Sequence, residues 1–241
     1  MNASLDGRTV LVTGANGGLG AEFVHQALAR EAAKVYAAAR TPQHWDDPRI
    51  QPLSLDITDA DDVARAAAAA PDVDLLVNNA GIAPAGDSIS GPEQDLRRIF
   101  ETNFFGTLGV ANAFSPVLMA NGGGTILNVL SAAAWINIPT GYAASKAAMW
   151  SATNALRTEL QGRGVQVIGL LVGMVDTPMS QRWDVPKVSA KSVVAQAYEG
   201  VTSGAIEVLA DESTRELKSR LSNPADQFYP WLDELLGSFV A

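Results

Sequence analysis

The chain has 241 residues, of which 47% are hydrophobic and only 18% are charged, so it can bury a large core and is not a disordered protein. Its net charge of −9 argues against a binding surface for nucleic acid or an anionic membrane, because phosphate groups are bound by lysine and arginine. The absence of cysteine excludes disulfides, thiolate catalysis and cysteine metal sites, and with only two histidines we expect no metal centre.

Short apolar runs alternate along the chain with longer segments whose apolar residues recur at helical spacing. Strands are predicted over residues 9–12, 34–39, 50–55, 73–77, 125–130, 165–172 and 205–209. Helices are predicted over residues 21–30, 59–70, 92–120, 141–161, 191–202 and 211–222. Because the strands are apolar throughout and helices separate them, the pattern predicts a parallel sheet covered by helices on both faces.

No linker-like stretch divides the chain, so we expect a single domain over residues 1–241. The aromatic cluster Tyr229–Leu232 is interpreted as a tail that packs on the body of the protein or on a second subunit. The first residues lack a basic segment followed by an apolar run, and no stretch reaches the roughly 18 apolar residues of a membrane helix. We therefore expect a soluble, cytoplasmic protein.

A glycine-rich turn, Thr13–Gly20 (TGANGGLG), joins the first predicted strand to the first predicted helix. Glycines at 14, 18 and 20 allow a sharp turn and let a pyrophosphate approach the backbone, and the helix N-terminus offers free N–H groups. The glycine pattern alone would also fit an ordinary turn between a strand and a helix. Its position between a strand and an amphipathic helix predicts a dinucleotide-binding site.

The end of the second predicted strand, Ala38-Ala39-Arg40, indicates which dinucleotide is bound. An acidic residue here would bind the ribose 2′-hydroxyl of NAD, and none is present. The guanidinium of Arg40 can instead pair with a 2′-phosphate through charge-assisted hydrogen bonds. Arg40 therefore favours NADP(H) over NAD, although a solvated surface arginine would fit the same position.

Tyr142 and Lys146 lie four residues apart in a predicted helix, so their side chains share one face. A free tyrosine has a pKa of about 10, and a neighbouring ammonium would lower that pKa by stabilising the phenolate. The pair could then donate a proton to a carbonyl oxygen or take one from an alcohol. The spacing alone would also fit polar surface residues. Ser131 and Asn78–Gly81 favour an active site, because each directly follows the carboxyl end of a predicted strand. The glycine turn lies at the same edge of the predicted sheet.

In this order, the motifs resemble those of the short-chain dehydrogenase/reductase family over essentially the whole chain. They are TGANGGLG at 13–20, Asp56, NNAG at 78–81, Asn103, Ser131, YAASK at 142–146 and Asp176–Met179. The resemblance implies an α/β, doubly wound, Rossmann-type domain with a seven-stranded parallel sheet flanked by helices, and a substrate-binding segment near residues 173–203. It also implies a homodimer or homotetramer, formed largely by the helix after Pro92 and the helix that carries Tyr142.

The resemblance implies four catalytic residues. Tyr142 would be the general acid/base, and Lys146 would lower the pKa of Tyr142 and bind the nicotinamide ribose. Ser131 would hydrogen-bond the substrate oxygen, and Asn103 would hold a water in a proton relay to Lys146.

Cofactor contacts are implied along the same motifs. Asp56 would contact the adenine, Asn79 and Ala80 would line the adenosine side, and Thr177 would hold the carboxamide. The full set is Gly14, Asn16, Gly18, Leu19, Gly20, Arg40, Asp56, Ile57, Asn79, Ala80, Gly81, Tyr142, Lys146, Val175 and Thr177.

Two features depart from the family pattern. The segment between Ser131 and Tyr142 is shorter than usual around Pro139–Gly141, which predicts a tighter loop and a reshaped pocket wall. The usual Pro-Gly after the sixth strand is Val172-Gly173 here, which predicts a shift in how the nicotinamide end is held. Neither departure removes a catalytic group.

The substrate pocket is predicted to be apolar and fairly open, because the segment between Met179 and Ala190, which covers the substrate in this family, is short. Each candidate wall residue would equally fit the core or a subunit contact. The candidates are Trp135, Ile136, Ile138, Met174 and Trp183. Walls with few charges suit a hydrophobic or aromatic carbonyl compound better than a phosphorylated one.

The first hypothesis for function is an oxidoreductase that transfers a hydride between NADP(H) and a small carbonyl or alcohol substrate, reducing a hydrophobic or aromatic ketone or aldehyde. The alternative is a catalytically idle dinucleotide sensor or scaffold protein. Loss of Tyr142 or Lys146 would mark such a protein, and both are present. A third alternative is an interaction protein that keeps the catalytic residues but does not use them. Only an activity assay would distinguish it from an enzyme.

Overall fold

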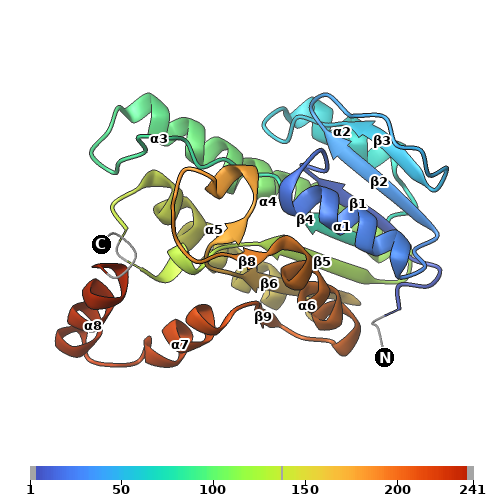
Figure 1. The fold of residues 1–241 in the computed structure, drawn as a ribbon. Coiled ribbons are helices and arrows are strands. Elements are labelled where there is room, and N and C mark those ends of the chain that lie inside the picture. The colour runs from blue at the N-terminus through green and yellow to red at the C-terminus, as the bar shows by residue number, and fades with distance from the viewer. Residues whose placement is uncertain (1–3, 137, 238–241) are drawn as a thin grey trace.

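The computed structural model describes residues 4–136 and 138–237, and its centre is a parallel sheet in the order β3-β2-β1-β4-β5-β6-β9 (Figure 1). The strands are β1 (Thr9–Thr13), β2 (Lys34–Ala39), β3 (Ile50–Ser54), β4 (Leu75–Asn78), β5 (Gly124–Val129), β6 (Val165–Leu171) and β9 (Glu207–Leu209). Two short strands, β7 (Val175–Asp176) and β8 (Val188–Ser189), pair separately. The predicted seven-stranded, doubly wound sheet is confirmed. Its order reverses between β1 and β4, which is where such sheets bind ligands.

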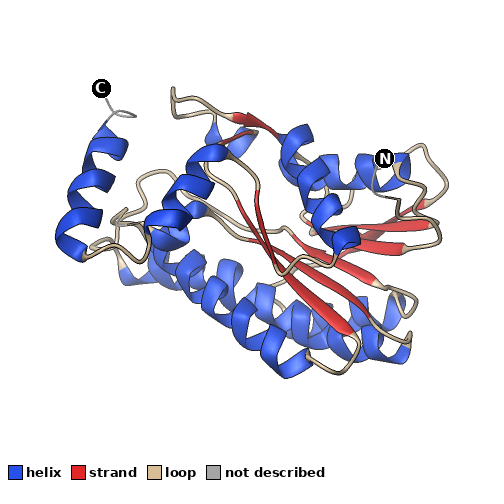
Figure 2. Cartoon of the chain, turned by 90° about the horizontal axis from the view of Figure 1, so that it is seen from below, coloured by secondary structure: helices blue, strands red, loops and turns tan. Residues whose placement is uncertain are grey.

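Helices cover both faces of the sheet (Figure 2). They are α1 (Gly18–Ala29), α2 (Ala60–Ala69), α3 (Glu93–Phe100), α4 (Thr107–Ala120), α5 (Gly141–Leu160), α6 (Ala190–Ser203), α7 (Glu212–Arg220) and α8 (Ala225–Gly237). α1 and α6 pack on the face that includes Val10 and Val12 of β1, and α2, α4 and α5 pack on the face that includes Leu11. The division follows from the alternation of side chains along a strand. Within the described residues, no helix has the length and apolar character needed to cross a membrane.

A wider helical turn interrupts the helix that the sequence predicts over residues 92–120. α3 continues into a π-helical turn, η1 (Glu101–Gly106), which continues into α4. A Cβ on Gly106 would lie 2.7 Å from the backbone oxygen of Ile57, so the close approach at this turn requires glycine. Turns of this kind are frequent at functional sites, and this one contains Asn103.

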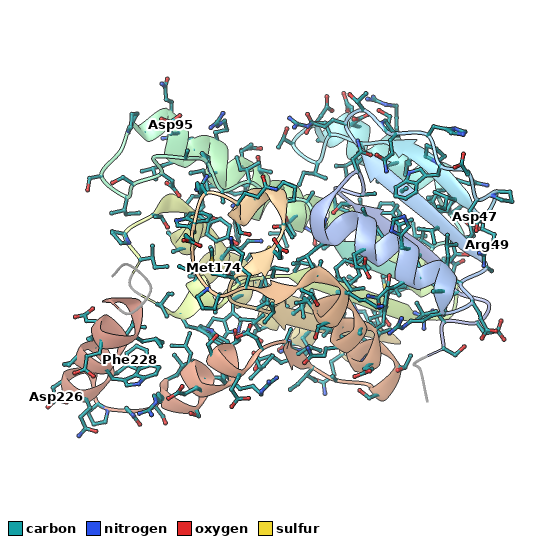
Figure 3. The ribbon with its side chains drawn as sticks, in the orientation of Figure 1. Asp47, Arg49, Asp95, Met174, Asp226 and Phe228 are labelled. Atoms are coloured by element: carbon teal, nitrogen blue, oxygen red, sulfur yellow. The ribbon has the colours of Figure 1, made fainter. Side chains whose placement is uncertain are left out.

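The end of the chain forms a helix where the sequence suggested a tail. The aromatic cluster Tyr229–Leu232 lies within α8, which follows α7. Phe228, labelled in Figure 3, and Leu232 are buried against Leu217 of α7 and Ala132. The tail therefore packs on the body of the same chain, which was one of the two expected alternatives.

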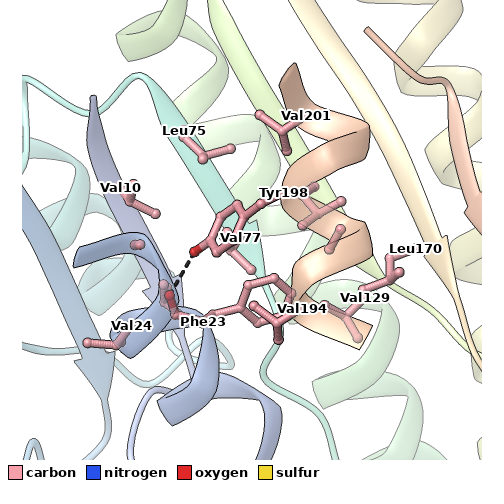
Figure 4. Packing of buried hydrophobic residues seen from close by; sticks show 14 of the residues in the cluster. Val10, Phe23, Val24, Leu75, Val77, Val129, Leu170, Val194, Tyr198 and Val201 are labelled. Carbon is pink, nitrogen blue, oxygen red and sulfur yellow. Dashed lines mark hydrogen bonds between the residues drawn. The ribbon is translucent and has the colours of Figure 1, made fainter. Parts of the chain in front are cut away.

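The contact between α1 and α6 contains a polar group in an apolar core (Figure 4). Tyr198 of α6 is fully buried, and its hydroxyl donates a hydrogen bond of 2.8 Å to the backbone oxygen of Phe23. The two rings meet edge to face with their centroids 5.5 Å apart. Burial raises the pKa of Tyr198, so its hydroxyl keeps its proton and remains a donor.

Tyr198→Phe is expected to lower the free energy of unfolding by about 1 kcal/mol, because it removes this buried hydrogen bond and keeps the ring contact. Urea unfolding at neutral pH measures the change. An unaltered dependence of the free energy on urea concentration would show that the same surface is exposed on unfolding. A variant as stable as the parent would contradict the prediction.

Candidate active site

A cavity of about 1380 Å³ opens at the carboxyl ends of the central strands. Its walls come from the glycine turn after β1, the loops after β4, β5 and β6, the start of α5, and the two C-terminal helices. Loops far apart in the sequence thus surround one space at the point where the strand order reverses.

The glycine turn presents backbone to this cavity. Gly14 and Gly18 have φ angles of +67° and +54°, in the region that side chains disfavour. A Cβ on Gly20 would lie 2.1 Å from the backbone oxygen of Gly14, so the turn closes only with glycine at position 20. Gly14, Gly18 and Leu19, which are predicted cofactor contacts, line the cavity, and Gly17, which was not predicted, lines it too.

Thr13 and Asn79 hold the ends of β1 and β4 together. The Thr13 hydroxyl oxygen accepts the backbone N–H groups of Asn79 at 2.9 Å and Ala80 at 3.0 Å. The side-chain amide of Asn79 donates back to the carbonyl oxygens of Thr13 at 2.8 Å and Gly14 at 3.3 Å. Asn79 therefore shapes the turn as well as lining the cavity. Thr13 was not singled out, although it opens the TGANGGLG motif.

Asn79 and Ala80 line the cavity, but five other predicted cofactor contacts, Asn16, Gly20, Arg40, Asp56 and Ile57, do not. Asn16 donates to the backbone oxygen of Thr41 at 2.7 Å, which ties the glycine turn to the loop after β2. Arg40 lies at the start of that loop; its side chain is exposed and has no hydrogen-bond or ion-pair partner within the described residues. The Asp56 carboxylate accepts the N–H of Thr58 at 3.0 Å and its hydroxyl at 2.7 Å. Gly20 and Ile57 are buried.

The predicted catalytic residues Tyr142, Ser131 and Lys146 share the cavity. The Lys146 ammonium lies 5.7 Å from the centre of the Tyr142 ring and donates to the backbone oxygen of Val129 at 2.8 Å. Burial lowers the pKa of Lys146 to about 8. Burial raises the pKa of Tyr142, and a hydrogen bond with the Ser131 side chain partly offsets this rise. The expected lowering of the Tyr142 pKa is thus not found in this structure, because burial outweighs the other effects.

Asn103 is buried between the loop after β4 and the start of α5. Its side-chain oxygen accepts the N–H of Ile82 at 2.8 Å, and its amide donates to the Ile82 oxygen at 2.9 Å and the Ser145 hydroxyl at 3.1 Å. A Cβ on Gly81 would lie 3.2 Å from the Asn103 side-chain oxygen and 3.7 Å from the Lys146 nitrogen. Asn103 and Lys146 therefore flank Gly81, while the water-holding role of Asn103 stays a prediction.

The segment after β6 is held by an aspartate that was not predicted. The buried Asp211 accepts the N–H of Gly173 at 2.7 Å, and it also accepts the hydroxyls of Ser213 at 2.6 Å and Thr214 at 2.7 Å. These hydrogen bonds outweigh burial and lower the pKa of Asp211. Val175 and Thr177, which are predicted cofactor contacts, line the cavity, and a Cβ on Gly18 would lie 3.5 Å from Thr177.

Comparison with known proteins identifies the family. Residues 8–187 match the family model described as short chain dehydrogenase. The chain belongs to the short-chain dehydrogenase family. The resemblance predicted from the sequence is thereby confirmed, and the protein is a member of a family of oxidoreductases.

This short-chain dehydrogenase is similar to several known proteins. It is 35% identical over 217 residues to a short-chain dehydrogenase of Penicillium crustosum, covering 80% of this chain and 77% of the relative. It is 36% identical over 190 residues to the galactitol 2-dehydrogenase (L-tagatose-forming) of Cereibacter sphaeroides, covering 73% and 74% of the two chains. A short chain dehydrogenase from Burkholderia cenocepacia, crystallised in complex with NADP, superposes with a TM-score of 0.89 at 37% identity, covering 95% of this chain and 98% of that chain.

The walls of the cavity differ in two respects from those predicted for the substrate pocket. Ile136, Ile138, Met174 and Trp183 line the cavity as predicted. Trp135 does not: it packs edge to face on Trp150 with centroids 5.9 Å apart, and the Lys218 ammonium lies 4.5 Å from its centre. The second difference is an unforeseen wall from α7 and α8. That wall includes Leu217, Leu232 and Leu235.

The predicted covering segment is hydrogen-bonded to the loop after β4, and residues of both line the cavity. Arg182 follows the short helical turn η3 (Pro178–Ser180) and donates to the backbone oxygen of Pro84 at 3.2 Å. Its guanidinium also lies 3.8 Å from the centre of the Trp183 ring. The segment is short, as expected, but it reaches the loop after β4 on the other side.

Lys146→Met is expected to change how the stability of the cofactor-free short-chain dehydrogenase depends on pH. The folded chain binds the Lys146 proton with a pKa of about 8, below the ordinary value of 10.5, so the folded chain loses this proton first as pH rises. The stability of the parent should therefore rise relative to the variant between these two pH values, by roughly 3 kcal/mol in total. Urea unfolding of both proteins at pH 7 and pH 10 measures the change. Parallel pH profiles would contradict it.

Proposed function

We propose that this short-chain dehydrogenase uses NADPH to reduce a hydrophobic or aromatic ketone or aldehyde. The observation that carries the proposal is that Tyr142 shares one cavity with Ser131 and Lys146, with the Lys146 ammonium 5.7 Å from the centre of its ring. A phenol that stays protonated at neutral pH suits a proton donor to a carbonyl oxygen. An idle sensor or scaffold is not favoured, because Tyr142, Lys146 and Ser131 are all retained and line one cavity.

The glycine turn fits a dinucleotide. Its backbone has no room for a side chain at position 20, glycines 14, 17 and 18 line the cavity, and α1 begins within the turn at Gly18. The N–H groups at the start of α1 and the turn would hold the pyrophosphate. The bound cofactor supplies the hydride, and the protein provides position and proton transfer.

The chain's own residues would complete the reaction at the substrate oxygen. Ser131 would hydrogen-bond this oxygen and orient the carbonyl group, while Tyr142 donates the proton. The Lys146 ammonium would stabilise the phenolate left on Tyr142 and bind the nicotinamide ribose. Asn103, which flanks Gly81 together with Lys146, would help to return a proton to this pair from solvent.

The preference for NADPH rests on Arg40. Its exposed guanidinium is unpaired within the described residues, and the Asn16 bond to Thr41 holds its loop against the glycine turn. No carboxylate of β2 is available to bind a ribose 2′-hydroxyl, because the strand ends Ala38-Ala39. The NADP found with the similar structure from Burkholderia cenocepacia supports this choice.

The substrate class rests on the walls. Residues 173–203 would form the substrate-binding segment of a single domain over 1–241, together with the leucines of α7 and α8. Ile136, Met174 and Trp183 add apolar surface next to the catalytic groups. An apolar or aromatic group on the carbonyl compound would bury against them. A homodimer or homotetramer and a cytoplasmic location belong to the same proposal.

The test measures NADPH and NADH consumption against a panel of aromatic, aliphatic and steroid-like carbonyl compounds. We expect turnover with NADPH, with kcat/KM highest for the hydrophobic members. Faster turnover of polar or phosphorylated carbonyl compounds would overturn the substrate class. Turnover of NADH in preference to NADPH would overturn the cofactor assignment alone.

A further inference from the structure

Asp87, in the loop after β4, holds the first turn of the helix that carries Tyr142. One carboxylate oxygen accepts the N–H of Gly141 at 2.9 Å, and the other accepts the N–H of Tyr142 at 2.8 Å. Thr140, the residue that precedes α5, caps a third group by accepting the N–H of Ala143 at 3.1 Å. The helix therefore has an ordinary cap of its own, and Asp87 adds a second anchor from a distant loop.

The geometry around Gly141 shows that this contact is closely fitted. A Cβ on Gly141 would lie 3.1 Å from the Asp87 carboxylate and 2.7 Å from the side chain of Leu96. The Ile89 N–H donates to the backbone oxygen of Pro139 at 2.9 Å. The loop after β4 is therefore hydrogen-bonded both to the residues just before α5 and to the first residues of α5. The shortened segment before Tyr142 thus packs directly on the loop after β4.

The same loop contacts two further parts of the site. Ile82 exchanges two hydrogen bonds with the side chain of Asn103, and Pro84 accepts the hydrogen bond from Arg182 of the covering segment. Asp87 also lines the cavity itself. A single loop therefore connects the covering segment, Asn103 and the backbone of Tyr142.

We infer that Asp87 is a positioning residue that fixes the Tyr142 phenol for proton transfer by anchoring the backbone amide of that tyrosine; this role rests on the proposed function. The Tyr142 side chain leaves the backbone next to the anchored amide, so a shift of the first helical turn moves the phenol with it. A displacement of about 1 Å in an active site can cost 10²-fold in rate. Asp87 would act through Tyr142 and not on the substrate.

The test compares Asp87→Ala with Asp59→Ala. Asp59 makes a matched pair of bonds at α2, outside the cavity, where its carboxylate accepts the N–H groups of Asp61 at 2.9 Å and Asp62 at 3.0 Å. Both variants should lower the melting temperature. Asp87→Ala should also lower kcat about tenfold or more, raise the solvent isotope effect on kcat, and leave KM and the Kd of NADPH nearly unchanged. Asp87→Asn, which keeps one acceptor oxygen, should lie between parent and Asp87→Ala.

A second readout is independent of turnover. The chain has four tyrosines, so ¹³C labelling at the tyrosine Cζ gives few signals, and Tyr142→Phe assigns the one from Tyr142. Asp87→Ala should move this signal and Asp59→Ala should not. An unmoved Tyr142 signal, or equal kcat in the two alanine variants, would overturn the inference. Full activity in Tyr142→Phe would instead overturn the proposed function, and the labelled spectra would still decide whether Asp87 positions Tyr142.

Discussion

Tyr142→Phe is expected to lower kcat for carbonyl reduction by about a thousandfold, because general acid catalysis typically contributes 10²–10⁴-fold. The substitution removes one oxygen atom from the cavity and leaves the ring, its burial and the Lys146 bond to Val129 unchanged. The Kd of NADPH should stay within about threefold, since only one of many predicted cofactor contacts loses an atom and the glycine turn and Arg40 are unchanged. Steady-state kinetics and quenching of protein fluorescence by NADPH measure the two quantities.

Tyr229→Phe is the matched control for this loss. Tyr229 lies on α8, is 48% exposed and does not line the cavity, so the same change of atoms there should leave kcat unaltered. A Tyr142→Phe enzyme that works at the parental rate would show that the proton reaches the substrate oxygen from another group. Ser131, the other hydroxyl beside the phenol, would then be the first group to replace.

The features that could be predicted from the sequence are those with local signals. Val10, Leu11 and Val12 make an unbroken apolar run, which is what a strand buried on both faces requires, and the glycine turn follows it directly. The four-residue spacing of Tyr142 and Lys146 places both on one face of α5, and both line the cavity. Patterns of this kind need only neighbouring residues to be interpreted.

The features that were missed depend on contacts between distant segments. Asp87 and Asp211 look like ordinary loop aspartates, and only the folded chain brings them to Gly141 and Gly173. The side chain of Trp135 likewise packs against Trp150 of α5 and does not line the cavity. The spacing of residues can place a residue on a helix or strand, but it does not show which side chains of the neighbouring elements that residue will contact.

The wall formed by α8 had a signal that could have been used. Phe228, Leu232 and Leu235 recur at helical spacing, and all three belong to the apolar cluster beside the cavity. The aromatic cluster Tyr229–Leu232, considered by itself, is interpreted as a tail instead, although Pro230 lies inside the helix. The π-turn at Asn103 left no such trace, because its wider turn changes the backbone hydrogen bonds and not the residue pattern.

Arg40→Ala is expected to raise the Kd of NADPH by about 10-fold to 100-fold and to leave the Kd of NADH nearly unchanged. A hydrogen bond to a charged group contributes about 1.5–3 kcal/mol, and only NADPH carries the 2′-phosphate that Arg40 would bind. Because the guanidinium is exposed, the loss should shrink as ionic strength rises. Fluorescence titration of both cofactors at low and high salt measures this difference.

Arg49→Ala is the control, because Arg49 is an exposed arginine just before β3 that is already paired with Asp47 at 2.7 Å (Figure 3). Arg49→Ala changes the net charge of the protein as much as Arg40→Ala does. It removes the partner of the Asp47 carboxylate, however, and not a group that is expected to bind the cofactor phosphate. An equal weakening of NADPH binding in both variants would mean that the general field of the protein attracts the cofactor. Loss confined to Arg40→Ala, and to NADPH, would mean that one guanidinium at the end of β2 distinguishes the two cofactors.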